Sequence, residues 1–167
     1  MTEMNHHPLM FTFRDTISGD GFLVRITLSG RALILKEDEK WWMYGVRPGA
    51  IAESGESPQE TVLRFRNRYR EVLFDIAGDH RTFDAFKKEV ERFFYEPDYE
   101  EERRWEDALT AIRSQNLCPP PSFRKLPRET PESRPAQMTV ERLDGRGRRF
   151  KPSDNVPDAY YSAAIAA

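Results

Sequence analysis

The spacing of apolar residues changes once along this chain of 167 residues, and that change constrains the fold more than any other feature. Between residues 11 and 46, apolar and polar residues alternate, which is typical of strands with one buried face. Between residues 58 and 114, apolar residues recur every three or four positions, as they do along one face of a helix. Several strands at hairpin spacing followed by helices predict an α+β fold with a three- to four-stranded antiparallel sheet.

Short turn signals divide the alternating part into strands. Residues 18–21, with the sequence SGDG, and the polar run at 37–40 are typical of hairpin turns. We also interpret the Ser-Gly pair at 29–30 as a break between two strands, because glycine weakens a strand interior. Strands are therefore expected over residues 11–16, 22–28, 31–36 and 41–46.

A capping box marks the start of the first helix. The hydroxyl of Ser57 can accept a hydrogen bond from the amide of Glu60, the Glu60 carboxylate can reach back to the cap amide, and Pro58 suits the first helical position. The amphipathic helix is expected to pack on the sheet and to run to Ile76, with Gly78 as its stop signal. Its apolar stripe consists of Val62, Phe65, Tyr69, Val72, Leu73 and Ile76.

Charge and proline are distributed unevenly along the chain. Residues 1–118 carry 17 Lys+Arg and 22 Asp+Glu, a net charge of −5, whereas residues 119–167 carry 9 and 6, a net charge of +3. The last 49 residues also hold 8 of the 12 prolines, and proline can neither donate to a strand ladder nor continue a helix. Residues 119–167 are therefore expected to form a proline-rich, mildly basic and largely irregular tail, in which only residues 137–143 alternate like a strand.

These patterns predict one domain with an appendage at each end. Residues 1–10 are expected to be a flexible N-terminus, and residues 11–118 to be the α+β domain. Within that domain, apolar stripes predict two further helices, over residues 82–95 and 99–114, as a helical extension.

Cysteine usage and hydropathy indicate the compartment. Cys118 is the chain's single cysteine, so no intrachain disulfide can form and a reducing environment is expected. No run of about 18 apolar residues is present, which argues against a membrane span. Residues 1–10 also lack the basic-then-apolar pattern of a secretory signal. We therefore expect a cytoplasmic protein.

The histidines and the cysteine form no recognisable catalytic or metal-binding pattern. His6, His7 and His80 lack the carboxylate or cysteine spacing that metal sites use. Cys118 precedes three prolines, and no histidine stands near it in the sequence. The glycines near Gly45 lack the lysine and the spacing of a phosphate loop. We expect no catalytic residue, no metal and no cofactor; a small enzyme with carboxylates on its sheet is the least supported hypothesis.

Basic residues gather at two places. The first helix carries Arg64, Arg66, Arg68 and Arg70, which border its apolar stripe on both sides. They can be solvated flanks whose stems cover apolar surface, or contacts for an acidic partner or a phosphate. The tail carries Arg146, Arg148, Arg149 and Lys151. This cluster leaves the same choice open between a solvated segment and a contact with phosphate or an acidic surface.

The strand expected over residues 41–46 carries three aromatic residues. Because side chains alternate along a strand, Trp41 and Trp42 must point to opposite faces, and Tyr44 shares the face of Trp42. One tryptophan can belong to the core. The other needs cover from a helix, from the tail or from a partner, in which case it is an interface anchor.

The order of residues from 42 to 76 resembles the HicB-like antitoxin family. An aromatic strand is followed by Pro48-Gly49 and then by Gly55, Ser57 and Glu60 at the helix start, where Thr61 replaces the usual alanine. The resemblance covers about residues 22–78. It implies a three-stranded antiparallel sheet backed by a helix, related to a degraded ribonuclease H-like fold. It also implies a bacterial toxin–antitoxin system, in which the protein blocks a small, HicA-type, mRNA-cleaving toxin.

Two hypotheses for function follow. The helical extension and the tail depart from the family, and the tail shows neither the helix-turn-helix nor the ribbon-helix-helix with which many members bind their operator. The first hypothesis is a non-enzymatic protein-binding module that covers a partner, such as a HicA-like toxin or a second copy of the chain. The alternative is a nucleic-acid-associated protein that uses the arginine-rich helix and the basic tail cluster.

Overall fold

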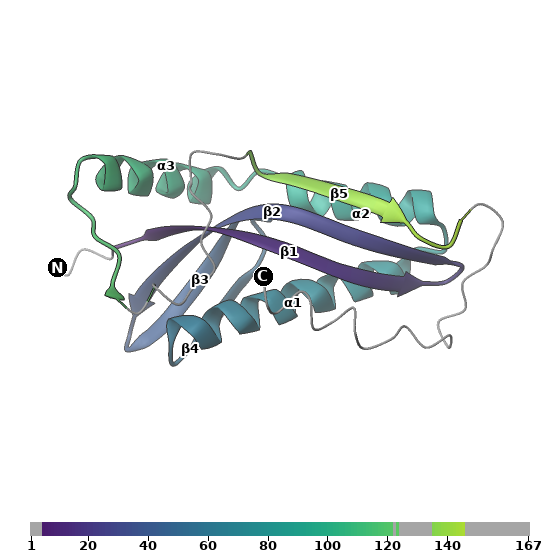
Figure 1. Ribbon diagram of the computed structural model, residues 1–167, viewed down its shortest axis with the longest axis horizontal. Coiled ribbons are helices and arrows are strands. Elements are labelled where there is room, and N and C mark those ends of the chain that lie inside the picture. The colour runs from purple at the N-terminus through teal and green to yellow at the C-terminus, as the bar shows by residue number, and fades with distance from the viewer. Residues whose placement is uncertain (1–4, 122, 124–134, 146–167) are drawn as a thin grey trace.

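The computed structural model describes residues 5–121, residue 123 and residues 135–145. Within these residues an antiparallel sheet of five strands packs with three helices (Figure 1), which confirms the α+β class. The elements in chain order are β1 (His7–Gly19), β2 (Phe22–Glu37), β3 (Lys40–Arg47), β4 (Ala52–Gly55), α1 (Pro58–Asp79), α2 (Phe83–Tyr95), α3 (Tyr99–Arg113) and β5 (Gln137–Arg142). No helix among the described residues combines the length and hydropathy needed to cross a bilayer.

The central strand β2 continues through the Ser-Gly pair, so the predicted break there is wrong. Gly30 lies opposite Phe11 of β1, and a Cβ atom on Gly30 would lie 2.4 Å from Cζ of the Phe11 ring. The glycine is therefore required by a close side-chain contact within a paired strand. β1 also begins earlier than expected, because His7 pairs with Ile34, so residues 7–10 belong to the sheet and not to a flexible N-terminus.

The second edge of β2 pairs with two different strands. β3 pairs with its C-terminal half, and β5 pairs with its N-terminal half between Val24 and Ser29. The Tyr95 hydroxyl accepts a hydrogen bond from the backbone N–H of Met138 at 3.1 Å, which links β5 to α2. The strand-like stretch of the expected tail thus belongs to the same sheet as the domain.

One face of the sheet, the inner face, packs against α1 and α2. Phe13 of β1 meets Tyr69 of α1 with ring centroids 5.0 Å apart, and Phe22 of β2 meets Phe86 of α2 at the same distance. Alternate residues of β1 and β2 fill this layer, as the pleat of a strand requires. The core side chains from β1 and β2 are Leu9, Phe11, Phe13, Ile17, Phe22, Val24, Ile26, Leu28, Ala32 and Ile34.

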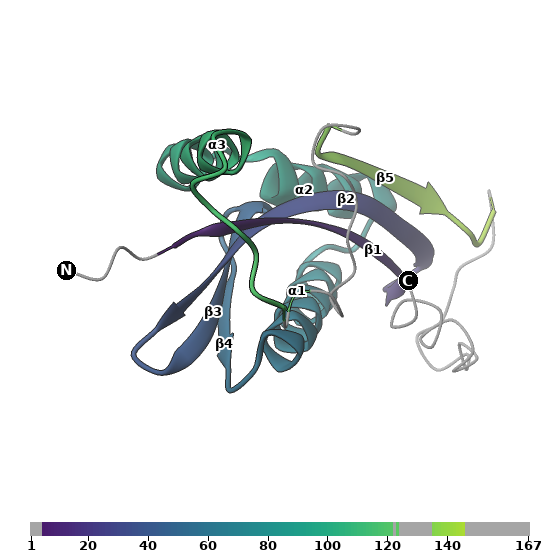
Figure 2. The same ribbon diagram turned by 60° about the vertical axis from the view of Figure 1, so that its left-hand side comes forward.

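The opposite face, the outer face, is covered in part by α3 (Figure 2). Trp105 and Ala108 of α3 pack in one buried cluster with Met10, Leu33 and Val46. The guanidinium of Arg31 lies over the Trp105 ring at 5.6 Å, and Arg47 of β3 forms an ion pair with Glu102 of α3. These contacts fix α3 against the outer positions of β2 and β3.

The helix boundaries agree with the capping signals, except at the end of α1. The Ser57 hydroxyl accepts from the amide of Glu60 at 3.2 Å, while the Glu60 carboxylate accepts from the amide of Glu56 and not from that of the cap. α1 continues through Gly78 and ends at Asp79, so the predicted stop is wrong. The extension helices α2 and α3 match the prediction to within one residue at each end.

Alanine substitutions at two glycines are expected to have opposite effects on stability. A Cβ on Gly45 would lie 1.9 Å from the carbonyl oxygen of Pro48, so Gly45→Ala should lower the free energy of unfolding by about 1–3 kcal/mol or more. A Cβ on Gly78 would have no atom within 4 Å, so Gly78→Ala should raise it by about 0.5–1 kcal/mol, since alanine favours the helix. Urea denaturation monitored by circular dichroism measures both. A Gly45→Ala variant as stable as the parent chain would contradict the described β3 geometry.

Candidate functional site

Strand β3 sends its two tryptophans to opposite faces, as the alternation predicts. Trp41 packs against the inner core, and its ring meets that of Phe123 edge-on at 5.6 Å. Phe123 therefore gives Trp41 cover from within the chain. Trp42 lies on the outer face, because it is the register partner of Leu35, two residues from the outer-face Leu33.

Trp42 and Tyr44 form a stacked pair, which we call the aromatic platform. Their ring centroids lie 5.8 Å apart, and the ring planes differ by 17°. Both side chains are half-buried, and they stand opposite the buried Leu35 and Leu33 of β2. The platform thus has apolar neighbours on β2 and keeps part of its aromatic surface accessible on the outer face.

Two carboxylates act on the Tyr44 hydroxyl of the platform. The Tyr44 hydroxyl donates to Oε2 of Glu37 at 3.4 Å. Burial raises the pKa of Tyr44, the negative charges of Glu37 and Glu101 raise it further, and Arg104 of α3 lowers it. Two of the three charges that act on this hydroxyl are therefore negative.

The beginning of α3 carries the second group of charges beside the platform. Arg104 forms ion pairs with Glu100 and Glu101, so its own positive charge is balanced on the helix. Oε2 of Glu101 is buried and has no hydrogen-bond partner among the described residues, and burial raises the pKa of this carboxyl. Glu101 therefore pairs with Arg104 through one oxygen, while its other oxygen is buried and accepts no hydrogen bond from the described residues.

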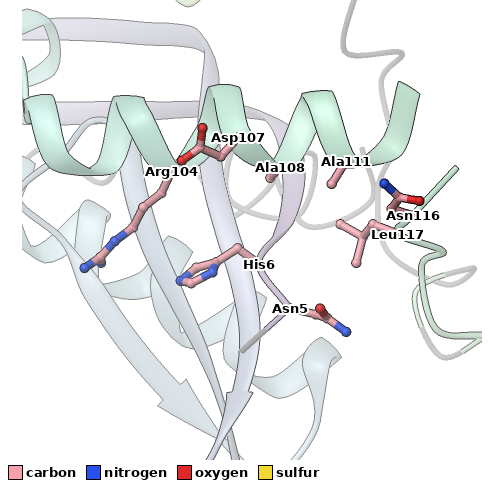
Figure 3. A pocket seen from close by; sticks show the side chains of 8 residues that line it. All are labelled: Asn5, His6, Arg104, Asp107, Ala108, Ala111, Asn116 and Leu117. Carbon is pink, nitrogen blue, oxygen red and sulfur yellow. The ribbon is translucent and has the colours of Figure 1, made fainter. Parts of the chain in front are cut away.

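A hollow of about 600 Å³ adjoins this region (Figure 3). Side chains of α3 line one side of it, and those of Asn5 and His6, just before β1, lie across from them. Arg104 belongs to both the hollow and the surroundings of Tyr44, so the hollow and the platform are neighbours. The lining residues are Asn5, His6, Arg104, Asp107, Ala108, Ala111, Asn116 and Leu117.

The chemistry of the hollow and the platform suits binding. The lining supplies amides, an imidazole, a carboxylate and a guanidinium, but no thiol or hydroxyl that could serve as a nucleophile. Within the described part of the chain, no three His, Cys, Asp or Glu side chains converge as metal ligands. A half-buried aromatic pair beside hydrogen-bonding groups is a common feature of recognition surfaces.

The arginines of α1 are engaged with acidic groups of the same chain. Arg64 pairs with Glu60 at 2.7 Å, and Arg68 pairs with Glu53 of β4 at 2.8 Å. Arg66 is half-buried, and burial lowers its pKa. The Arg68–Glu53 pair links α1 to β4, whereas the Arg64–Glu60 pair lies within the helix.

Arg70 pairs with a buried carboxylate of β1. Its Nε lies 3.0 Å from Oδ2 of Asp15, whose side chain is only 4% exposed. Oδ1 of Asp15 accepts from the backbone N–H of Thr16 at 2.8 Å. Burial raises the pKa of Asp15, and the Thr16 hydrogen bond and Arg70 only partly offset that shift. Burial therefore destabilises the ionised form of Asp15 more than the Thr16 hydrogen bond and Arg70 stabilise it.

Several residues of this region carry no signal in the sequence. The hollow combines residues 5–6 with residues 104–117, and no fixed spacing links segments so far apart. Only the charged start of α3 could have pointed to Glu101 and Arg104. The predicted basic cluster of Arg146, Arg148, Arg149 and Lys151 lies outside the described residues.

Comparisons with protein-family models, with curated proteins and with solved structures found no match to this chain.

Replacing Asp15 should change how stability depends on pH. A carboxyl whose pKa is raised by folding stabilises the protein most below its ordinary pKa of 3.8, and that contribution is lost as pH rises through the raised value. Asp15→Asn keeps an oxygen for the Thr16 amide but carries no charge. Its free energy of unfolding relative to the parent chain should therefore rise between pH 4 and pH 7. The prediction would be contradicted if urea titrations showed the free energy of unfolding of Asp15→Asn falling relative to the parent chain over this range. That result would mean that the charge of Arg70 stabilises the ionised carboxylate more than burial destabilises it.

Proposed function

We propose that this chain is a non-enzymatic protein-binding module that covers a partner protein with the outer face of its sheet, in the manner of a HicB-type antitoxin. The observation that supports this best is the aromatic platform. Trp42 and Tyr44 are stacked and half-buried, and their register partners on the neighbouring strand are Leu35 and Leu33. Aromatic side chains held rigidly at a surface are the residues that most often dominate binding energy at protein interfaces.

The charge of the domain favours a basic partner. Residues 1–118 carry a net charge of −5, and Glu37 and Glu101 lie beside the platform. A protein that cleaves RNA must attract phosphate groups and so presents basic surface. A small HicA-like toxin in a reducing, cytoplasmic compartment therefore fits the proposal, and a second copy of this acidic domain fits it less well.

The nucleic-acid alternative has weaker support. Arg64, Arg68 and Arg70 of α1 each pair with a carboxylate of the chain, so a phosphate would have to compete with Glu60, Glu53 and Asp15. The two hypotheses also differ in salt dependence, because phosphate binding releases counterions and weakens steeply with added salt.

Two adjacent tryptophans give a matched test of the proposal. The tagged chain is co-expressed with the product of a small adjacent open reading frame, and the affinity of the purified pair is measured by calorimetry. Trp42→Ala and Tyr44→Ala should each weaken binding at least about tenfold, in variants that circular dichroism shows to be folded at the assay temperature. Trp41→Ala should instead lower the free energy of unfolding by about 3 kcal/mol, since it opens the contact with Phe123.

Two outcomes would count against this function. If the chain purifies alone and does not affect the neighbouring gene product, the antitoxin interpretation loses its support. If it binds single- or double-stranded oligonucleotides with an affinity that falls steeply between about 50 and 200 mM salt, the nucleic-acid alternative replaces it.

A further inference from the structure

We infer that the aromatic platform recognises an arginine side chain of the partner, with the guanidinium lying on the ring of Trp42 and hydrogen-bonded by the carboxylate of Glu37. This inference rests on the proposed function and names the chemistry that its docking surface selects.

The charges around the platform select a cation. Glu37 lies within 3.4 Å of the Tyr44 hydroxyl, and Glu101 keeps one buried oxygen without a hydrogen-bond partner. Two nearby positive groups are balanced by acids, because Arg104 pairs with Glu100 and Glu101, and Arg47 pairs with Glu102. Lys40, the register partner of Glu37, is exposed at the turn between β2 and β3. A cation that enters here meets carboxylates and an aromatic ring, whose face is itself attractive to positive charge.

The geometry favours arginine over lysine. A planar guanidinium can stack on an indole and at the same time donate two hydrogen bonds to a carboxylate, which a lysine ammonium cannot do. The chain uses the same kind of contact internally, because Arg31, Arg70 and Arg142 lie over Trp105, Phe74 and Phe83 at 5.4 to 5.6 Å. Trp42 itself is half-buried, with its ring stacked on that of Tyr44.

The same surface disfavours nucleic acid as the occupant. A base could stack on Trp42, but its phosphates would then approach Glu37, Glu100 and Glu101. Repulsion between these like charges makes a protein with an exposed arginine the better fit.

Three tryptophans provide built-in reporters for this inference. N-acetyl-arginine amide is titrated into the ¹⁵N-labelled full chain, and the three indole N–H signals are followed by NMR. The Trp42 signal should shift in a saturable way. Those of Trp41, which Phe123 contacts, and of Trp105, which is 2% exposed, should stay in place. N-acetyl-lysine amide should bind at least about threefold more weakly.

Two neighbouring glutamates supply a matched pair of variants. Glu37→Gln keeps the size of the side chain but removes the charge beside Tyr44, and should weaken binding of the arginine probe at least about threefold. Glu39→Gln removes an exposed charge that pairs only with Lys36 among the described residues, and should leave binding within about twofold of the parent chain.

Three results would overturn the inference: a Trp42 signal that does not move up to about 100 mM probe, equal binding of the lysine probe, or no effect of Glu37→Gln. These failures are distinguishable from failure of the proposed function. If Trp42→Ala abolishes partner binding while the arginine probe does not bind, the platform is a docking surface of a different kind. If the probe binds while the chain purifies without any partner, the arginine site stands and the proposed function fails.

Discussion

The paired backbone of β2 is the constraint on which the rest of the structure depends. This strand of 16 residues pairs with β1 along one edge and with β3 and β5 along the other, so it cannot shift register without breaking both sets of hydrogen bonds. Side chains alternate strictly along it. Once Ile34 enters the inner core, Leu33 and Leu35 must lie on the outer face.

That alternation determines where the aromatic residues of β3 stand. Tyr44 and Trp42 are the register partners of Leu33 and Leu35, so they share the outer face, while Trp41 is sent to the inner core. The clusters formed by α1 and α2 close the inner layer, and α3 covers the outer face around Met10, Leu33 and Val46. One short strand thereby supplies a core residue on one face and a half-buried aromatic pair on the other, with Glu37 and Glu101 near the Tyr44 hydroxyl.

Local patterns predicted the elements, and the contacts that they missed are all tertiary. The capping box placed α1, and alternation placed Trp41 and Trp42 on opposite faces. The prediction that Gly30 ends a strand was wrong, because the Phe11 ring on the paired strand leaves no space there for a Cβ atom. The prediction that Gly78 stops the first helix was also wrong, because α1 continues to Asp79 and no atom lies within 4 Å of a Cβ at Gly78. In both cases the reason lies in residues, or in free space, that the local sequence does not show.

In the candidate site too, local patterns predicted some residues, and tertiary packing determined the others. The aromatic residues could be named from the sequence, since strand alternation alone places one tryptophan on each face. Their acidic surroundings could not, because Glu101 and Arg104 reach Tyr44 only through the packing of α3 on the sheet. The arginines of α1 were visible as a pattern, but their partners Asp15 and Glu53 lie on strands that the helix meets only in the fold.

Amide hydrogen exchange along β2 tests the central claim most directly. The backbone N–H groups of Arg25, Thr27 and Ser29 face β5, and those of Leu33 and Leu35 face β3. If β2 is one continuous strand with both partners in place, exchange at the first three amides should be slowed to a degree comparable with the last two. Fast exchange confined to Arg25, Thr27 and Ser29 would contradict it, because β2 would then lack β5 as a partner.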